Sequence, residues 1–107
     1  MMTIEIFYFA DCPNSVPAFE RVRAALESQH ILAEVRMVEV YDQEEAAAYR
    51  FLGSPTIRVD GKDVEREARS RRDYGFMCRT YSTPSGKTGM PSMQMIMGAI
   101  SEQVRTR

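Results

Sequence analysis

Cys12 is the first residue of this chain whose type and setting point to chemistry. It follows the apolar run Ile4–Phe9 and stands directly before Pro13. Such a run, bounded by Asp-Cys-Pro, is typical of a buried strand, and proline fits the first position of a helix. A helix start carries partial positive charge and unpaired N–H groups, which stabilise a thiolate, the reactive form of cysteine. The sequence therefore predicts a nucleophilic thiol at a strand-to-helix junction.

The first third of the chain predicts the strand–helix–strand unit that would position this thiol. Residues Thr3–Phe9 read as a strand buried on both faces. Apolar residues then recur at helical spacing from Pro13 to about Gln29, and Ala33–Val40 reads as a second strand.

A second helix is predicted from local capping signals. Asp42 is a good N-cap, and Glu45, three residues later, completes a capping box. The helix is expected to continue to Leu52, with Gly53 closing it at the C′ position.

A hairpin and a last helix complete the expected elements. Thr56–Val59 is the third strand, Asp60-Gly61 is a favoured two-residue turn, and Lys62–Val64 begins the fourth strand. Residues 65–89 are rich in arginine and turn residues, and Pro91 opens the last helix. The apolar face of that helix is expected to consist of Met93, Ile96, Met97, Ile100 and Val104.

A cysteine at the start of the first helix, with a proline before the third strand, resembles the thioredoxin and glutaredoxin fold. The resemblance implies an α/β fold with a four-stranded mixed sheet flanked by three helices. It covers nearly the whole chain as a single domain, residues 1–107, apart from the arginine-rich insertion 65–89 after the fourth strand.

The resemblance makes Cys12 the catalytic cysteine, but Ser15 stands where dithiol members have a second cysteine. The Cys-Pro-Asn-Ser motif is similar to the monothiol glutaredoxin pattern, in which one cysteine forms mixed disulfides. Ser15 is expected to donate a hydrogen bond to the thiolate. No lysine shortly precedes Cys12 and no late Cys-Asp pair follows, so iron–sulfur carriage is not expected.

Pro55 matches the family's proline before the third strand, which is cis and faces the catalytic cysteine. In the family, the backbone of the preceding residue pairs with the substrate chain, and this role carries over to Ser54. Together with Pro13, these residues form the expected substrate-binding set. The alternative interpretation is an ordinary trans turn after a helix.

Cys78 is the other cysteine of the chain. In the proposed fold the fourth strand returns toward the active-site end, so the loop after Val64 should emerge beside Cys12. Cys78 would then act as a remote resolving cysteine in place of the missing local one. Its neighbours Phe76 and Met77 favour the other interpretation, a small buried hydrophobic residue. Both interpretations stay open.

Two further groups of residues are candidate sites. The arginines of the insertion could hold an anionic substrate or activate the thiol, but a solvated face with local ion pairs is favoured; they are Arg66, Arg69, Arg71, Arg72 and Arg79. Four methionines, Met90, Met93, Met95 and Met97, suggest a thioether site for Cu(I). The helical spacing of Met93 and Met97 favours core packing, so no metal site is predicted.

Composition excludes several classes of protein. The chain has 107 residues, 27% of them charged, with a formal net charge of −1, which argues against a nucleic-acid-binding domain. No apolar run approaches the roughly 20 residues that span a bilayer. The N-terminus lacks the features of a signal peptide, so a cytoplasmic protein without membrane contact is expected.

The leading hypothesis is a small thiol oxidoreductase that acts on protein or low-molecular-weight thiols. Cys12 is the nucleophile, Ser15 its polar partner, and Cys78 the resolving cysteine. No cofactor is needed, because the thiols carry the electrons. The rival is a non-enzymatic module that captures a soft metal or an organomercurial, with Cys78 as the second ligand. A third interpretation is a redox-inert adaptor in which Cys12 only caps a helix.

Overall fold

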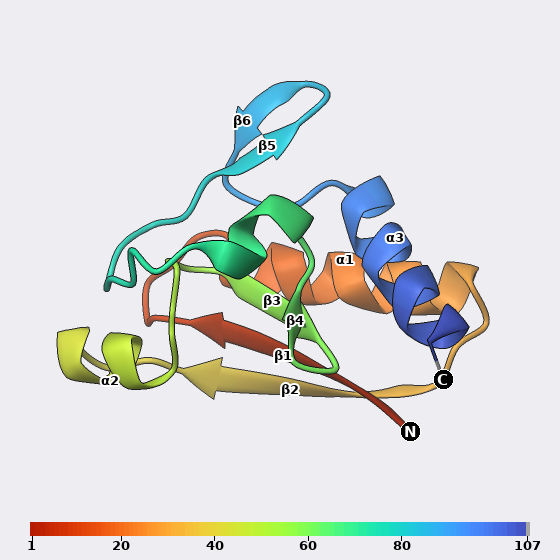
Figure 1. Ribbon diagram of the computed structural model, residues 1–107, viewed down its shortest axis with the longest axis horizontal. Helices are drawn as coiled ribbons and strands as arrows, with labels where there is room; N and C mark the ends of the chain where they lie inside the picture. The colour runs from red at the N-terminus through yellow and green to blue at the C-terminus, as the bar shows by residue number, and fades with distance from the viewer. Residues whose placement is uncertain (107) are drawn as a thin grey trace.

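A four-stranded mixed sheet forms the centre of the computed structural model, which describes residues 1–106 (Figure 1). Strand β1 (Met2–Tyr8) runs parallel to β2 (Ala33–Glu39), and α1 (Ser15–Ser28) connects them. Strand β3 (Thr56–Val59) is antiparallel to β1, and the short β4 (Lys62–Asp63) is antiparallel to β3. The strand order is β2-β1-β3-β4, so the predicted mixed sheet is confirmed.

The remaining elements surround this sheet. They are α2 (Gln43–Ala48), the 3₁₀ helix η1 (Arg66–Ser70), β5 (Tyr81–Thr83), β6 (Gly86–Thr88) and α3 (Met93–Arg105). The segment expected to be irregular thus contains a 3₁₀ turn and a small antiparallel hairpin, which stands apart from the main sheet (Figure 1). Among residues 1–106, no helix combines the length and the apolar character needed to cross a bilayer.

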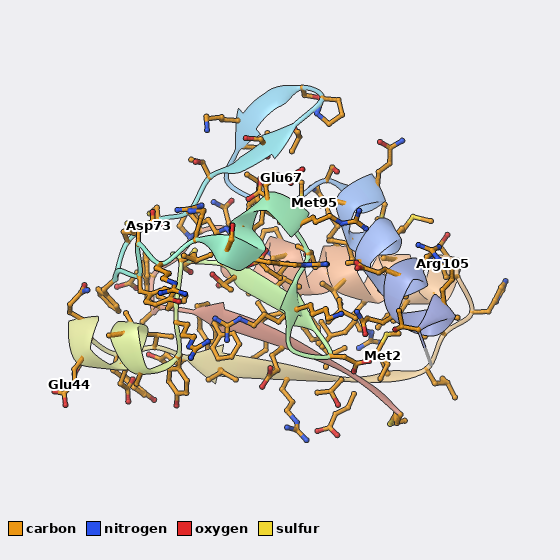
Figure 2. All side chains as sticks on the ribbon, viewed as in Figure 1. Met2, Glu44, Glu67, Asp73, Met95 and Arg105 are labelled. Atoms are coloured by element: carbon orange, nitrogen blue, oxygen red, sulfur yellow. The ribbon has the colours of Figure 1, made fainter. Side chains whose placement is uncertain are left out.

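The main core lies between the sheet and the pair α1 and α3, which cover the same face (Figures 1 and 2). Ile4 and Ile6 of β1 are fully buried there, whereas Thr3 and Glu5, which alternate with them, are only half-buried. The prediction that β1 is buried on both faces is therefore wrong for its first half. The reason is that α2 covers only the end of the opposite face, where Phe7 packs in a second, smaller core.

Helix α1 ends at Ser28, close to the predicted end, whereas the end of α2 differs from the predicted one. Helix α2 ends at Ala48 rather than Leu52, and Arg50 takes the left-handed C′ position with φ of 56°. The Phe51 N–H then donates to the Ala46 carbonyl at 2.8 Å, which closes a Schellman motif. His30 plays the same part after α1, with φ of 54°. Gly53 is therefore not a helix cap. A glycine is required at this position for another reason, described below.

Helix α3 begins after the N-cap Ser92, whose Oγ accepts a hydrogen bond from the Met95 N–H at 3.1 Å. Met93 and Met97 pack half-buried against the main core, as the core-packing interpretation expects. Val104 is 49% exposed, so its place on the predicted apolar face is wrong.

An ion pair joins η1 to α3. The Arg69 guanidinium donates to both carboxylate oxygens of Glu102, at 3.0 and 2.8 Å. Such two-point contacts fix the orientation of the two side chains. The hydrogen bond and the charge of Arg69 lower the pKa of Glu102 to about 2.

This pair gives a pH prediction. Because folding lowers the pKa of Glu102 from 4.5 to about 2, its contribution to stability is present above about 4.5 and is lost as the pH falls toward 2. We expect wild type to have a higher unfolding temperature than Glu102→Gln at neutral pH, and the difference to shrink over that range. Thermal unfolding of both proteins against pH measures it. A constant difference down to the lowest pH would contradict the prediction.

Candidate thiol site

Cys12 lies in the turn between β1 and α1 and is only 7% exposed. Its N–H donates to the Phe9 carbonyl at 3.3 Å. Its carbonyl accepts from Ser15 twice, from the N–H at 3.4 Å and from Oγ at 3.1 Å. Ser15 therefore donates its hydroxyl to the backbone of Cys12, not to the thiol as the sequence suggested. Its role in this structure is to hold the shape of the turn.

Pro13 is not the first residue of the helix. The helix begins at Ser15, Asn14 is its N-cap, and Pro13 is exposed in the turn before it. The Asn14 side chain makes no capping hydrogen bond within the described part of the chain. Cys12 therefore lies three residues before the helix rather than at its cap.

The Ser54-Pro55 peptide bond is cis, which confirms the predicted isomer and excludes the trans turn. Ser54 is only 1% exposed, and Pro55 is fully buried. The two residues lie directly before β3, whose Thr56 is opposite Phe7 of β1. They are therefore next to the end of β1 from which the Cys12 turn emerges.

Residues 75–80, which we call the strap, run alongside Ser54. The Ser54 N–H donates to the Met77 carbonyl at 2.8 Å, and the Ser54 carbonyl accepts from the Arg79 N–H at 3.1 Å. These two bonds form a parallel β-bridge between Ser54 and Cys78. Both backbone groups that the resemblance assigns to a substrate chain are thus used by the protein's own strap.

Ser54 also connects the strap to the Cys12 turn. Its Oγ accepts from the Phe9 N–H at 3.3 Å, and the Phe9 ring lies 5.1 Å from the Phe76 ring of the strap. Paired residues on adjacent strands direct their side chains to the same face, so Cys78 is on the side of Ser54 that faces Phe9.

Both cysteines are free thiols, and they lie at the same end of the sheet, as predicted. Cys78 is exposed, so the interpretation of Cys78 as a buried hydrophobic residue is wrong. Cys12 is the buried one of the two.

The chain comes very close to itself where the strap docks. Gly53 has φ of 112°, and a Cβ added there would lie 2.9 Å from the Arg79 Cβ. Only glycine fits this approach without a shift. Two further bonds hold the strap, from Gly75 N–H to the Phe51 carbonyl at 2.9 Å and from Phe76 N–H to Gln43 Oε1 at 3.0 Å.

A buried charge cluster anchors the end of the strap. The Arg79 side chain is 1% exposed and donates to both oxygens of Asp63, at 2.7 and 2.8 Å, and to Glu65 at 3.2 Å. Its guanidinium also lies 4.1 Å from the ring centre of Tyr81, whose hydroxyl donates to the Pro55 carbonyl. Burial raises the pKa of Tyr81, so this hydroxyl remains a donor over the physiological range.

Arg79 is therefore a structural residue rather than an activator of the thiol. Burial alone would lower its pKa, but hydrogen bonds and charge interactions, chiefly with Asp63, raise it. Asp63 and Glu65 are not predicted from the sequence to be the partners of Arg79. The sequence feature that could have revealed them is the alternation Asp63-Val64-Glu65, which places two acids on the same face of an extended segment.

Three other arginines of the segment also pair with acids. Arg66 and Arg69 contact Glu102 of α3, and Arg71 contacts Asp73 at 2.6 Å. The favoured interpretation, local ion pairing, is confirmed for Arg71, whereas Arg66 and Arg69 pair with an acid of a distant helix. Within residues 1–106, no group of three or more His, Cys, Asp or Glu side chains is arranged to hold a metal ion.

Comparison with known proteins found no family model, no curated protein and no solved structure that matches this chain.

Proposed function

We propose that the protein is a thiol–disulfide oxidoreductase on a thioredoxin-like domain, with Cys12 and Cys78 as its redox pair. The observation that carries this proposal is the β-bridge between Ser54 and Cys78. Through Ser54, this bridge brings the exposed cysteine to the end of the sheet where the Cys12 turn is held by Phe9. A disulfide between the two cysteines requires that their Cα atoms come within about 7 Å of each other.

Exposure favours an order of events opposite to that expected from the sequence. Cys78 is exposed and Cys12 is buried, so Cys78 is the thiol that an incoming disulfide can reach. Cys12 then acts as the resolving cysteine. Reaction rates in thiol exchange depend on access as well as on the thiolate fraction.

The reaction balances without a cofactor. The Cys78 thiolate attacks one sulfur of the substrate disulfide, forms a mixed disulfide and releases the first substrate thiolate. The Cys12 thiolate then attacks the Cys78 sulfur, forms the internal disulfide and releases the second thiolate. The two protons lost by the cysteines are taken up by the leaving thiolates, and two electrons pass to the substrate. Two molecules of an external low-molecular-weight thiol then reduce the internal disulfide, return the protein to its dithiol form and are released as their own disulfide.

The docked strap favours a small substrate. A protein substrate that adds a strand beside the cis-proline needs the backbone groups of Ser54, and Met77 and Arg79 already occupy both. A low-molecular-weight disulfide needs only access to the Cys78 sulfur. We therefore propose small disulfides as the substrate class.

Oxidation with diamide tests the redox pair. Wild type is expected to form an intramolecular Cys12–Cys78 disulfide, seen by mass spectrometry of the unreduced protein, and neither Cys12→Ser nor Cys78→Ser can form it. With hydroxyethyl disulfide, Cys12→Ser is expected to accumulate a mixed disulfide at Cys78, because its resolving cysteine is missing. Thiol-dependent reduction of the same disulfide should be lost in Cys78→Ser, and it should be slower in Cys12→Ser, where the external thiol has to resolve the mixed disulfide.

Other outcomes are equally informative. Two free thiols in diamide-treated wild type would refute the redox pair. A mixed disulfide trapped at Cys12 in Cys78→Ser, with none at Cys78 in Cys12→Ser, would refute attack by Cys78 and restore the order expected from the sequence. Stoichiometric capture of phenylmercury by both thiols, without catalytic turnover, would favour the binding module instead.

A further inference from the structure

Strand β2 is an edge of the sheet, and its outer side pairs with no other strand in residues 1–106. We infer that this edge is where a second copy of the chain docks, as an antiparallel strand related by a twofold axis. The two four-stranded sheets would then join into one continuous sheet. The inference is independent of the redox proposal.

Hydrogen bonds show which residues of β2 point their backbone outward. The Val40 N–H donates inward to the Tyr8 carbonyl of β1 at 2.7 Å. The N–H and C=O groups of successive residues in a strand point to alternate sides. Even-numbered residues of β2 therefore bond to β1, and Ala33, Val35 and Met37 present their N–H and C=O groups to the open side.

A twofold axis at Val35 pairs all of these outward-pointing N–H and C=O groups. Val35 of one copy would pair with Val35 of the other, exchanging both backbone hydrogen bonds, and Ala33 would pair in the same way with Met37. An interface of this kind is isologous, because the same patch serves both copies. All outward-pointing residues from 33 to 37 find partners in this register.

The same register matches the charges. Glu34 of one copy falls opposite Arg36 of the other, twice over by symmetry, at non-hydrogen-bonded positions where side chains are closest. Both side chains are about half exposed, 48% and 54%, and in the single chain they pair with each other along the strand. An axis at residue 33 would instead place Glu34 opposite Leu32, and an axis at residue 37 would place Arg36 opposite Val38. Only the axis at Val35 sets the opposite charges against each other.

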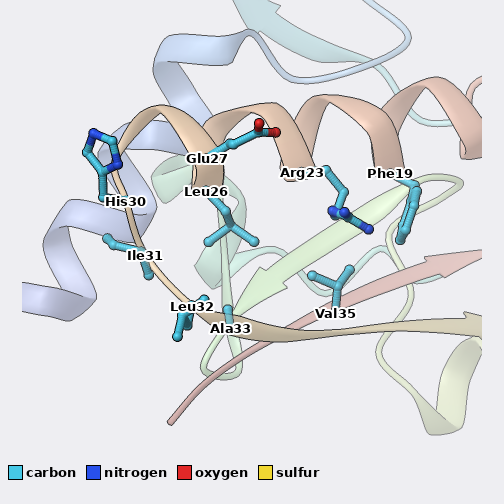
Figure 3. Close-up of a pocket in the computed structure, with 9 residues that line it drawn as sticks. All are labelled: Phe19, Arg23, Leu26, Glu27, His30, Ile31, Leu32, Ala33 and Val35. Carbon is cyan, nitrogen blue, oxygen red and sulfur yellow. The ribbon is translucent and has the colours of Figure 1, made fainter.

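A hollow of mixed polarity follows this edge. A cavity of about 740 Å³ lies between α1 and the start of β2 (Figure 3). Phe19, Leu26, Ile31 and Val35 give it apolar walls, and Arg23, Glu27 and His30 line it as well. Leu32, at its rim, is 85% exposed. In the proposed register Leu32 falls opposite Val38 of the second copy, so docking would shield it from water.

Charge reversal gives a sharp test. Wild type, E34R, R36E and the double variant E34R/R36E are compared by sedimentation equilibrium, with folding checked by circular dichroism. Wild type and the double variant are expected to be dimers, because opposite charges still face each other. Each single variant places like charges opposite each other twice and should dimerise at least about ten-fold more weakly.

Mixing the two single variants is the experiment that tests the proposed charge pairing most directly. E34R and R36E should form a heterodimer with each other, because arginines on one strand then face glutamates on the other. E67R, a charge reversal on η1 away from β2 (Figure 2), is the matched control and should leave the dimer unchanged. A monomeric wild type, or variants that all associate equally, would overturn the inference and leave Glu34 and Arg36 as charges that guard an exposed edge.

Discussion

Replacement of Arg79 by methionine is expected to lower the free energy of unfolding by about 3–5 kcal/mol, the range for breaking a buried ion pair by removing one partner. The guanidinium is 1% exposed and is held by Asp63 and Glu65, whose side chains are 6% and 10% exposed. Without it, two carboxylates remain close together with little access to water, and each disfavours the charge of the other. Urea unfolding of Arg79→Met measures the loss.

A surface ion pair in the same segment supplies the matched control. Arg71 contacts Asp73 at 2.6 Å, but both side chains are well exposed, so Arg71→Met should cost less than about 1 kcal/mol. The triple variant Asp63→Asn, Glu65→Gln, Arg79→Met should recover part of the loss, since it removes the unpaired charges. A cost for Arg79→Met as small as that of Arg71→Met would show that the cluster does not hold the strap.

Alanine at Gly53 is expected to be the second large effect, with a loss of about 2–4 kcal/mol from backbone strain and a steric clash together. The backbone there has φ of 112°, and the new Cβ would lie 2.9 Å from the Arg79 Cβ. The contact is between chain segments rather than with the end of a flexible side chain, so the strap has to move away.

Gly86→Ala is the matched control for this variant. Gly86 has a similar φ of 105°, but a Cβ there would meet no atom within 4 Å. It should therefore show the strain alone, about 1–2 kcal/mol. Denaturant unfolding of both variants separates the two contributions, and equal losses would contradict the role of the Arg79 contact.

Displacement of the strap also has a chemical readout. Because Cys78 belongs to the strap, Gly53→Ala should form the internal disulfide more slowly under diamide than Gly86→Ala does. Mass spectrometry of quenched samples follows both rates. Equal rates would mean that the cysteines meet without the docked strap.

Local signals in the sequence determined most of the regular elements. Asp42 Oδ1 accepts from the Glu45 N–H at 2.8 Å, as the capping box predicts. Asp60 and Gly61 both have positive φ, 50° and 85°, as the predicted hairpin turn requires. These features depend on residues within a few positions of one another, so a sequence pattern is enough to encode them.

The ends of helices and the roles of single polar groups are less predictable. The sequence pattern predicts a helix cap at Gly53, whereas Arg50 ends α2 and Gly53 accommodates Arg79. The resemblance makes Ser15 a partner of the thiol, whereas Ser15 donates to the Cys12 carbonyl. In both cases the residue type is consistent with two roles, and the sequence does not decide between them.

The sequence by itself therefore determined the sheet, the cis-proline site and the end of the sheet where both cysteines lie. Only the tertiary structure decided that Cys78 is exposed and Cys12 buried, that the strap occupies Ser54, and that Arg79 is held by Asp63 and Glu65. The physical reason is that these contacts join residues at least 14 positions apart in the sequence, in segments without a repeating pattern. Their geometry follows from how the chain packs as a whole, and burial assigns each group its partner only then.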